Sequence, residues 1–496
     1  MTVATGRAMT DGSVELAGIV EMVLERDTDD RPAIVENNRT TSYRELADLT
    51  MRLAGGLRRR LGEEPDSRLV VVHPGMPESV ALTLAGWSIG TTVAVLPSYL
   101  RARELDRLLG ASGTALVVSD GAVAGRRSLP MSGLLDVPRP STSEAAPGAW
   151  FAAFTSGTNG YPLWVDRRVD RLHADVRQVS QAIGLASTDR VAAMATTPFT
   201  TSVLPALLAG ATVMSMPMTS VGQFWRDVRD RSVTAISGTP YVYELAVRKP
   251  PARGDIARLR LALSSSARLR PATARSFAQH TGTSIHNLLS STEAGHIAYN
   301  DASAPEASSH SVGRPLPRVE AEIRDEDGVG LAAGHEGQLW VRSPYAATRY
   351  RNDAGETGTV FRGEWVVSAD IGYRDERGYL YLVGRNDSRI HFGVAKLDPR
   401  ELEGVLREHP GVRDVVVVGE PHPRLGQLPV ARVVAARGVS AEDLLAFCRL
   451  HLSPTKVPQR IEFVPQIPKS AEGQATRPGS VRFEPGDIRG QDRSTE

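Results

Sequence analysis

The chain has 496 residues, which at about 150 residues per domain suggests roughly two to four folded units. Hydrophobic residues make up 41% and charged residues 23%, a composition typical of globular proteins and not of disordered or fibrous ones. The 58 basic residues nearly cancel the 57 acidic ones, which argues against a nucleic-acid partner held by bulk charge.

The cysteine count and the hydropathy of the sequence further limit the class of protein. The single cysteine, Cys448, excludes an intrachain disulfide framework and a cysteine-rich metal site, and we expect a buried thiol inside a helix. No apolar run approaches the length of a membrane span. The first residues lack the basic and apolar segments of a secretory signal. These patterns predict a soluble cytoplasmic protein.

Helical and strand patterns alternate through the first third of the chain. Helices are expected over 42–61, from 77 onward and over 101–110, and strands over 69–72, 92–96 and 115–118. This order predicts a parallel α/β sheet. Residues 121–148 are rich in Gly, Pro, Ser and Ala and are expected to form a loose connection. An apolar run at 150–154 then predicts another strand, and the alternation continues to about residue 300.

The pattern of predicted secondary structure changes twice in the second part of the chain. Between 311 and 385 it consists of short β-type runs separated by turn signals. Beyond a polar joint, Asp398, Pro399 and Glu401 predict a helix start with an N-cap, a proline at the first position and a capping-box acid. We therefore expect an N-terminal domain at 1–385, a small C-terminal domain at 386–480 and a tail at 481–496.

A segment dense in Gly, Ser and Thr follows the apolar run at 150–154. Its residues are Thr155, Ser156, Gly157, Thr158, Asn159 and Gly160. Backbone N–H groups and hydroxyls gathered in such a loop bind phosphate oxygens without a formal charge. An ordinary surface turn is the alternative, and the segment is not a Walker A loop because no Gly-Lys-Ser/Thr follows.

Three further positions carry candidate nucleotide chemistry. Glu293 follows an apolar strand on a Gly-containing loop and could hold Mg²⁺. Asp370 lies among apolar strand residues and could accept hydrogen bonds from a ribose diol. At the joint, Arg385 could reach phosphate or ribose oxygens, and Asp387 could be the pivot of a hinge. The alternatives are an exposed loop glutamate, a turn-capping aspartate and a surface ion pair.

The order of these features along the chain carries a resemblance to one family. The segments are FTSGTNGYPLWV (154–165), LLSSTEAG (288–295), SVGRPLP (311–317), GEWVVSADIGYRDERGYLYLVGRNDSRI (363–390), GVAKLDPRELE (393–403) and PKSAEGQATR (468–477). Together they resemble the adenylate-forming superfamily of acyl-CoA synthetases, peptide-synthetase adenylation domains and luciferases. The resemblance implies an α/β fold: a large N-terminal domain of mixed sheets with flanking helices and a β-rich subdomain, plus a small mobile α+β C-terminal domain.

The resemblance also implies a role for each matching residue. The loop from Thr155 to Gly160 would hold the β- and γ-phosphates of ATP, with Leu289 packing against the adenine. Thr292 would contact the α-phosphate and Glu293 would bind Mg²⁺. Asp370 would take the ribose hydroxyls with support from Arg385, and Asp387 would be the hinge.

The implied reaction has two halves. A carboxylate oxygen attacks the α-phosphorus of ATP, which releases pyrophosphate and leaves an acyl-AMP. The small domain then turns, and a thiol or an amine takes the acyl group. This scheme requires ATP and Mg²⁺. It leaves open whether the acceptor is CoA, the phosphopantetheine of a separate carrier protein, or a free amine.

Several residues depart from the family pattern. Leu163 stands in place of a lysine in the phosphate loop, and Leu289 and Ser290 replace a Tyr-Gly pair that stacks on adenine. Gln474 stands at the position of the catalytic lysine, and losing such a positioned donor costs about 3–4 kcal/mol. His391 replaces a lysine often used in the second half-reaction.

These departures keep three hypotheses open. The first is an adenylating ligase that is slowed or rescued by another cation. The second is a divergent enzyme that activates nitrite with ATP for diazotisation of an aryl amine. The third is a nucleotide- or acyl-binding relative whose catalysis has weakened.

The acid pocket implied by the resemblance has small, hydroxylated walls and one aromatic residue. Its residues are Phe199, Thr200 and Thr201, then Ser237, Gly238 and Thr239, then Ser264, Ser265 and Ser266. No charged side chain among them would hold an amino-acid ammonium group, which favours a small aryl or acyl acid. Ordinary Ser/Thr turns at strand ends are the alternative.

Overall fold

The structure is a computed structural model. It describes residues 18–62, 68–72, 75–97, 100–114, 116–119, 128–136, 148–156, 162–194, 199–216, 220–251, 256–267, 269–301, 310–385, 389–393, 395–467 and 481–482. Within these residues, no helix combines the length and apolar character needed to cross a bilayer.

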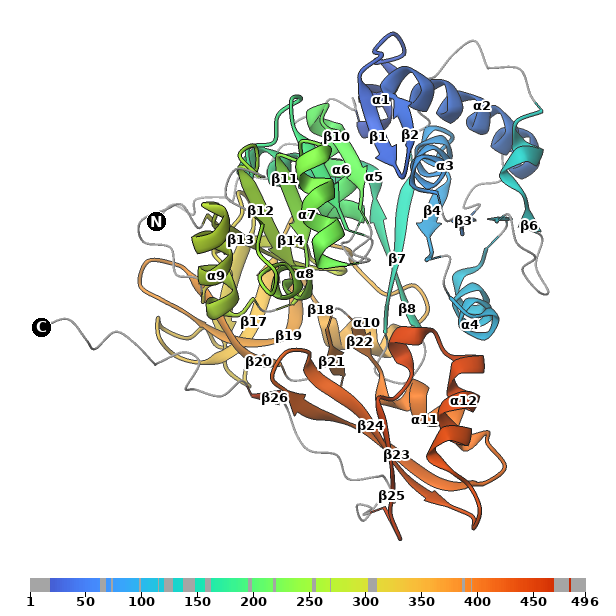
Figure 1. Cartoon of the computed structure of the whole chain (residues 1–496), viewed down its shortest axis with the longest axis vertical. Coiled ribbons are helices and arrows are strands. Elements are labelled where there is room, and N and C mark those ends of the chain that lie inside the picture. The colour runs from blue at the N-terminus through green and yellow to red at the C-terminus, as the bar shows by residue number, and fades with distance from the viewer. Residues whose placement is uncertain are drawn as a thin grey trace, which may run out of the picture.

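Two large sheets form the body of the N-terminal part (Figure 1). The nine-stranded sheet runs in the order β15 (Arg314–Pro315), β14 (Gly295–Asn300), β13 (Ile285–Ser291), β12 (Leu261–Ser265), β11 (Ala235–Gly238), β9 (Arg190–Ala193), β10 (Thr212–Ser215), β1 (Pro32–Glu36) and β2 (Arg39–Ser42). The six-stranded sheet runs in the order β6 (Ser128–Leu129), β5 (Leu116–Val118), β3 (Arg68–Val71), β4 (Thr92–Val95), β7 (Trp150–Ser156) and β8 (Pro162–Arg168). Central strands of both sheets pair in parallel, as the alternating sequence pattern predicts.

Helices cover both faces of both sheets. The helices between the sheets are α1 (Ile19–Leu24), α2 (Tyr43–Leu61), α3 (Met76–Ser88), α5 (Val169–Ala182) and α6 (Phe199–Ala209). The outer face of the larger sheet carries α7 (Val221–Asp230), α8 (Pro240–Ala246) and α9 (Pro271–Thr281), and that of the smaller sheet carries α4 (Ala102–Ser112). Strand alternation explains these layers: Leu69 and Val71 face the inner helices, whereas Val70 faces α4.

A β-rich subdomain follows the larger sheet. Its strands run in the order β16 (Glu320–Arg324), β17 (Gly337–Arg342), β19 (Trp365–Arg374), β20 (Leu380–Arg385) and β26 (Val481–Arg482), with β18 (Phe361–Arg362) on β19 and the helix α10 (Ala354–Val360) before it. β26 pairs antiparallel with β20, although the sequence places it in the expected tail.

The C-terminal lobe is a small α+β unit with its own core. Its sheet runs in the order β22 (Ala395–Leu397), β21 (Ile390–Phe392), β24 (Gly426–Ala435) and β23 (Val412–His422), with β25 (Arg460–Phe463) on β24. Its helical elements are α11 (Pro399–Arg407), α12 (Ala441–His451) and the 3₁₀ turn η2 (Pro454–Lys456). Cys448 is buried in α12, as predicted. The architecture confirms the predicted fold class.

Two local predictions need correction. The segment 121–148 contains regular structure, because β6 pairs with β5 and a 3₁₀ turn η1 (Met131–Leu134) buries Leu134. Gly56 of α2 allows this turn to approach, since a Cβ there would lie 2.1 Å from the Leu134 carbonyl oxygen. At α11, Asp398 accepts the N–H of Arg400 as an N-cap, but Glu401 forms an ion pair with Lys456 and no capping box.

Polar contacts join α4 to the C-terminal lobe, and Figure 1 shows α4 beside α12. Lys456 Nζ lies 2.9 Å from Glu104 Oε1 and 2.8 Å from Glu401 Oε1. The Ser453 hydroxyl also donates to Glu104, and Arg103 pairs with Glu408. Burial alone would lower the pKa of Lys456, but Glu401 and Glu104 raise it, so the amine stays charged.

Replacing Lys456 by Met should loosen this contact, because the buried Glu104 carboxylate loses its counter-charge. Removing one partner of a buried pair costs about 3–5 kcal/mol, and the partial exposure of Lys456 places the expected cost near the lower end. We expect Lys456→Met to lower the apparent melting temperature in a thermal scan, whereas Lys249→Met, at an exposed position, leaves it unchanged. Identical melting curves for the two variants would contradict a stabilising role for this contact.

Candidate active site

The predicted pocket residues gather at one edge of the nine-stranded sheet. Ser237 and Gly238 end β11, Ser264 and Ser265 end β12, and the register places Gly238 beside Ser264. Leu289 lies near the end of the next strand, β13. This is the carboxyl edge of parallel strands, where ligands bind in open α/β sheets.

Hydroxyl groups at this edge are buried without partners. Thr239 Oγ1, Ser264 Oγ and Ser265 Oγ make no hydrogen bond within the part of the chain that the structure describes. Thr239 is the N-cap residue of α8, yet its side chain does not cap the helix. Because a buried unpaired hydroxyl costs about 1–3 kcal/mol, these groups suit a ligand or water with hydrogen-bonding atoms.

The predicted phosphate loop leaves the smaller sheet at the end of β7. Thr155 and Ser156 end this strand, and Thr155 pairs with Leu163 of β8. Arg389 Nη1, beyond the joint, donates to Thr155 Oγ1 at 3.3 Å. The strand end therefore meets the segment that connects the two lobes. Gly157, Thr158, Asn159 and Gly160 lie outside the described residues.

Glu293 is held by a tyrosine that the sequence analysis did not identify. The Tyr350 hydroxyl donates to Glu293 Oε1 at 2.8 Å, and Tyr350 also bridges to Val165 of β8. Burial and the neighbouring Glu293 raise the pKa of Tyr350 well above its usual range, so the hydroxyl keeps its proton and donates. The carboxylate is thereby fixed near the middle of β8, where Val165 lies beside Tyr350. Thr292 lies next to it in the same turn.

A single carboxylate here is compatible with Mg²⁺. Magnesium ions in nucleotide sites are commonly bound by one or two carboxylates together with substrate phosphates. Within the described ranges, no group of three or more His, Cys, Asp or Glu forms an all-protein metal cage. The Glu293 carboxylate therefore fits an ion shared with a bound nucleotide.

Leu163 has a structural reason for being apolar. It is 3% exposed and packs in a small cluster with Val165, Ala347 and Tyr350. A lysine side chain there would have to leave this cluster or bury its charge. The departure from the family pattern thus helps to fix Tyr350, which holds Glu293.

Asp370 and Arg385 face each other on neighbouring strands. They are register partners in β19 and β20, and the Arg385 guanidinium pairs with Asp370 Oδ1. The Ser368 hydroxyl donates to Asp370 Oδ2 at 2.7 Å. The carboxylate is 8% exposed and lies where β20 reaches the joint. An oriented carboxylate of this kind can accept hydrogen bonds from a diol.

A buried ionic network lies next to the Glu293 turn, and the sequence analysis missed it. Arg167 Nη2 lies 2.6 Å from Asp175 Oδ2, and His296 Nδ1 lies 3.0 Å from the same oxygen. Gln178 and the His296 backbone N–H donate to Asp175 Oδ1. Burial alone would raise the pKa of Asp175, but His296 and Arg167 lower it below its usual range, so the carboxylate is ionised.

Gly295 lets this network reach the turn. Its φ is +82°, and a Cβ there would lie 2.6 Å from Arg167 Nη2 and 2.7 Å from Asp175 Oδ2. The turn that carries Glu293 is therefore pressed against the ion pair. In the sequence, His296 directly follows the STEAG segment. Its partner Asp175, on α5, lies more than a hundred residues earlier in the chain, so the sequence gives no sign of the pair.

The remaining predicted residues divide between described and undescribed parts of the chain. Phe199 and Thr200 begin α6 after β9, near the same sheet edge. His391 lies in β21 opposite Lys396 of β22, and its backbone N–H donates to Gln427 Oε1. Asp387 and Gln474 lie outside the described residues.

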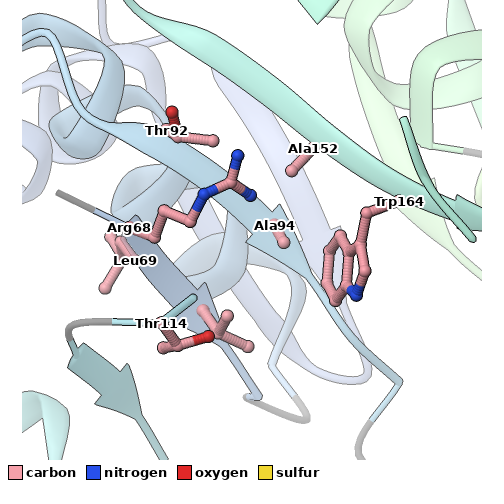
Figure 2. Close-up of a pocket in the computed structure, with 8 residues that line it drawn as sticks. Arg68, Leu69, Thr92, Ala94, Thr114, Ala152 and Trp164 are labelled. Carbon is pink, nitrogen blue, oxygen red and sulfur yellow. The ribbon is translucent and has the colours of Figure 1, made fainter. Parts of the chain in front are cut away.

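A separate small pocket lies inside the six-stranded sheet under α4. Figure 2 shows Arg68 there between Thr92, Ala94 and the Trp164 ring. Arg68 is 3% exposed and pairs with Asp166, which also accepts from Arg351. The Arg68 guanidinium is therefore held in a structural ion pair, and none of the predicted site residues lines this pocket.

Comparison with known proteins identifies the family of the chain. The family model of AMP-binding enzymes matches residues 21–351, and that of the AMP-binding enzyme C-terminal domain matches residues 401–474. Oxalate–CoA ligase of Arabidopsis thaliana is 27% identical over 93% of this chain and 97% of its own length. Feruloyl-CoA synthase of an Amycolatopsis species is 28% identical over 91% of this chain and 95% of its own.

A solved structure has the same fold as this chain. The amide bond synthetase McbA from Marinactinospora thermotolerans superposes with a TM-score of 0.81, at 27% identity, over 92% of this chain and 98% of its own. The fold and the family models together define an adenylate-forming enzyme. The chain belongs to the AMP-binding enzyme family, as the six sequence segments indicate, and its class is that of AMP-forming, acid-activating ligases.

Tyr350→Phe tests the support of Glu293, because it removes the donor and keeps the ring. A hydrogen bond to a charged group contributes about 1.5–3 kcal/mol, so we expect ATP binding in the presence of Mg²⁺ to weaken by about tenfold or more. Calorimetric titration with ATP, with and without Mg²⁺, measures this. Tyr241→Phe, at an exposed tyrosine, is the control. Equal losses with and without Mg²⁺ would show that Tyr350 acts on the fold and not on Glu293.

Proposed function

We propose that the chain uses ATP to activate a small aryl or acyl carboxylic acid as an acyl-AMP, releases pyrophosphate, and passes the acyl group to a thiol or an amine. The observation that carries this proposal is the buried Asp370 carboxylate, held by Arg385 and Ser368 at the edge where the two lobes join. Such a group suits a ribose diol, and the family match supports a nucleotide there.

The phosphates would lie between the end of β7 and Glu293. Thr155 and Ser156 lead into the proposed phosphate loop, and Thr292 and Glu293 would face the α-phosphate side. When bound, Mg²⁺ neutralises phosphate charge and polarises the phosphorus for attack. Tyr350 keeps the Glu293 carboxylate aimed, and Arg389 supplies a cation beside Thr155.

The acid would bind at the edge formed by α6, β11 and β12. Its walls are Phe199 and the hydroxyls of Thr200, Thr239, Ser264 and Ser265, which suit a small acid with polar substituents. Formation of the mixed anhydride makes AMP the leaving group in the second step, and AMP leaves far more readily than the oxygen of a free carboxylate.

The acceptor proposed is CoA, the phosphopantetheine of a separate carrier protein, or an amine. The curated relatives named above are CoA ligases, whereas the solved relative is an amide bond synthetase. His391 and Lys396 are register partners on the β21–β22 hairpin of the small lobe, and we expect His391 to act in the second half-reaction. Asp387 is proposed as the hinge and Gln474 as the residue that contacts the reacting carboxylate.

Asp370→Asn tests the ribose site. We expect a loss of about 10- to 100-fold in ATP affinity, because a neutral amide accepts the diol hydrogen bonds less strongly and leaves Arg385 without its counter-charge. The same substitution should barely change the already weak affinity for 2′,3′-dideoxy-ATP. Fluorescence titration with both nucleotides measures the difference, with Asp327→Asn at an exposed turn as the control. An equal loss for both nucleotides would contradict contact with the diol.

Incubation with ATP, Mg²⁺ and a library of aryl and short acyl acids tests the reaction. We expect pyrophosphate release with a subset of acids and an AMP-linked intermediate of matching mass by mass spectrometry. Release with nitrite and an aryl amine, but with no carboxylic acid, would overturn the proposal in favour of diazotisation. ATP binding without release from any acid would overturn it in favour of a non-catalytic relative. Gln474→Lys, assayed in parallel, reports whether the glutamine limits adenylation.

A further inference from the structure

A hydroxyl, an imidazole and a carboxylate lie in line beneath the candidate active site. Thr201 Oγ1 lies 3.2 Å from His296 Nε2, and His296 Nδ1 lies 3.0 Å from Asp175 Oδ2. The three residues come from α6, β14 and α5. Each is at most 2% exposed, so water does not compete for these hydrogen bonds.

The roles in this line follow from the chemistry of its carboxylate end. An ionised carboxylate only accepts hydrogen bonds, so His296 Nδ1 must carry a proton. In the Nδ1–H tautomer of the imidazole, Nε2 is an acceptor, and the Thr201 hydroxyl would donate to it. This is the order of groups in hydroxyl–imidazole–carboxylate triads, where the imidazole takes a proton through the hydroxyl.

The line also joins the two halves of the proposed site. Thr201 directly follows Phe199 and Thr200, which wall the proposed acid pocket. His296 follows the turn that carries Glu293, on the proposed nucleotide side. The line therefore borders both the proposed acid pocket, at the start of α6, and the turn of the proposed nucleotide site, at the start of β14.

We propose that Thr201 and His296 form a proton-accepting pair for an amine acceptor in the second half-reaction, with Asp175 as the positioning residue; this inference rests on the proposed function. The amine lone pair forms a bond to the acyl carbon, the bond from that carbon to the phosphate oxygen breaks, and AMP leaves with the electron pair. The excess proton on nitrogen passes to the Thr201 oxygen as the hydroxyl proton passes to His296 Nε2. Asp175 stabilises the imidazolium, which returns the proton through the Thr201 hydroxyl to water that enters the pocket after the amide and AMP have left.

An amine needs this pair more than a thiol does. Thiols have a pKa near 8.5 and attack as thiolates, which have no proton to lose on forming the new bond. Alkylamines have a pKa near 10.4, so the nitrogen must lose one proton before attack and another as the amide forms. General base catalysis contributes about 10²–10⁴-fold to such steps.

A purely structural role is the competing explanation, because the same network ties α5 to β14. Such a role predicts equal damage to both half-reactions. The proposed role predicts a separation: acyl-AMP formation persists while transfer to an amine fails. Thr201→Ser, which keeps a hydroxyl at this position, should also retain acyl transfer to the amine.

The first test needs no acid substrate. ¹⁵N NMR of ring-labelled histidine, with His296→Gln for assignment, reports the tautomer of His296 in the full-length protein. We expect the Nδ1–H tautomer at neutral pH and a changed Nε2 shift in Thr201→Val. An Nε2–H tautomer would overturn the inference even if the acid library shows acyl-AMP formation.

The second test separates the half-reactions with the acid that releases the most pyrophosphate, and with ammonia, benzylamine or CoA as acceptor. We expect amide formation in the native chain. In Thr201→Val and His296→Gln, we expect the rate of transfer from acyl-AMP to the amine to fall by about 10²-fold more than the rate of adenylation falls. Thr201→Ser should restore transfer. Equal losses in both half-reactions, or faster transfer to CoA than to either amine, would overturn the inference. Pyrophosphate release from no acid would overturn the proposed function and this inference with it, whatever the tautomer.

Discussion

The buried Asp175 carboxylate is the interaction on which the geometry of the site depends. Removing a carboxylate from water is costly unless its charge and lone pairs are satisfied. Here Arg167, His296 and Gln178 all point at it, and they come from β8, β14 and α5 itself. The strand next to the proposed phosphate loop and the strand after Glu293 therefore share one anchor. The turn that carries Glu293, between β13 and β14, needs Gly295, because no side chain fits against the ion pair.

The acidic groups of the site are oriented by neighbours and not left to solvent. Tyr350 donates to Glu293, and Ser368 and Arg385 hold Asp370. Tyr350 and Arg385 come from elements other than those of the acids they hold, whereas Ser368 lies two residues before Asp370 in the same strand. Such preorganisation reduces the reorganisation that a nucleotide would otherwise require on binding.

The sequence revealed the architecture well where local chemistry decides structure. The strand that begins at Trp150 and the buried Cys448 follow from the spacing of apolar residues. It failed where distant segments decide. Glu401 resembles a capping-box acid, but Lys456 lies close enough to form an ion pair with it. Tyr350 and Asp175 have no local signature, because their roles depend on Glu293 and His296, which only the folded chain brings near. The weak strand β6 exists because β5 offers it a free edge.

The contact at α4 has an asymmetric outcome when the lobes part. Lys456 belongs to the small lobe, where it keeps Glu401 as a partner, whereas Glu104 stays behind on α4. A carboxylate that is 3% exposed in the docked arrangement is then uncovered, and hydration replaces the lost ammonium. If the small lobe turns as the proposed function requires, its separation is compensated by water entering at one helix. Hydration of that helix, and not only the length of the connecting segment, would then govern how easily the small lobe moves away.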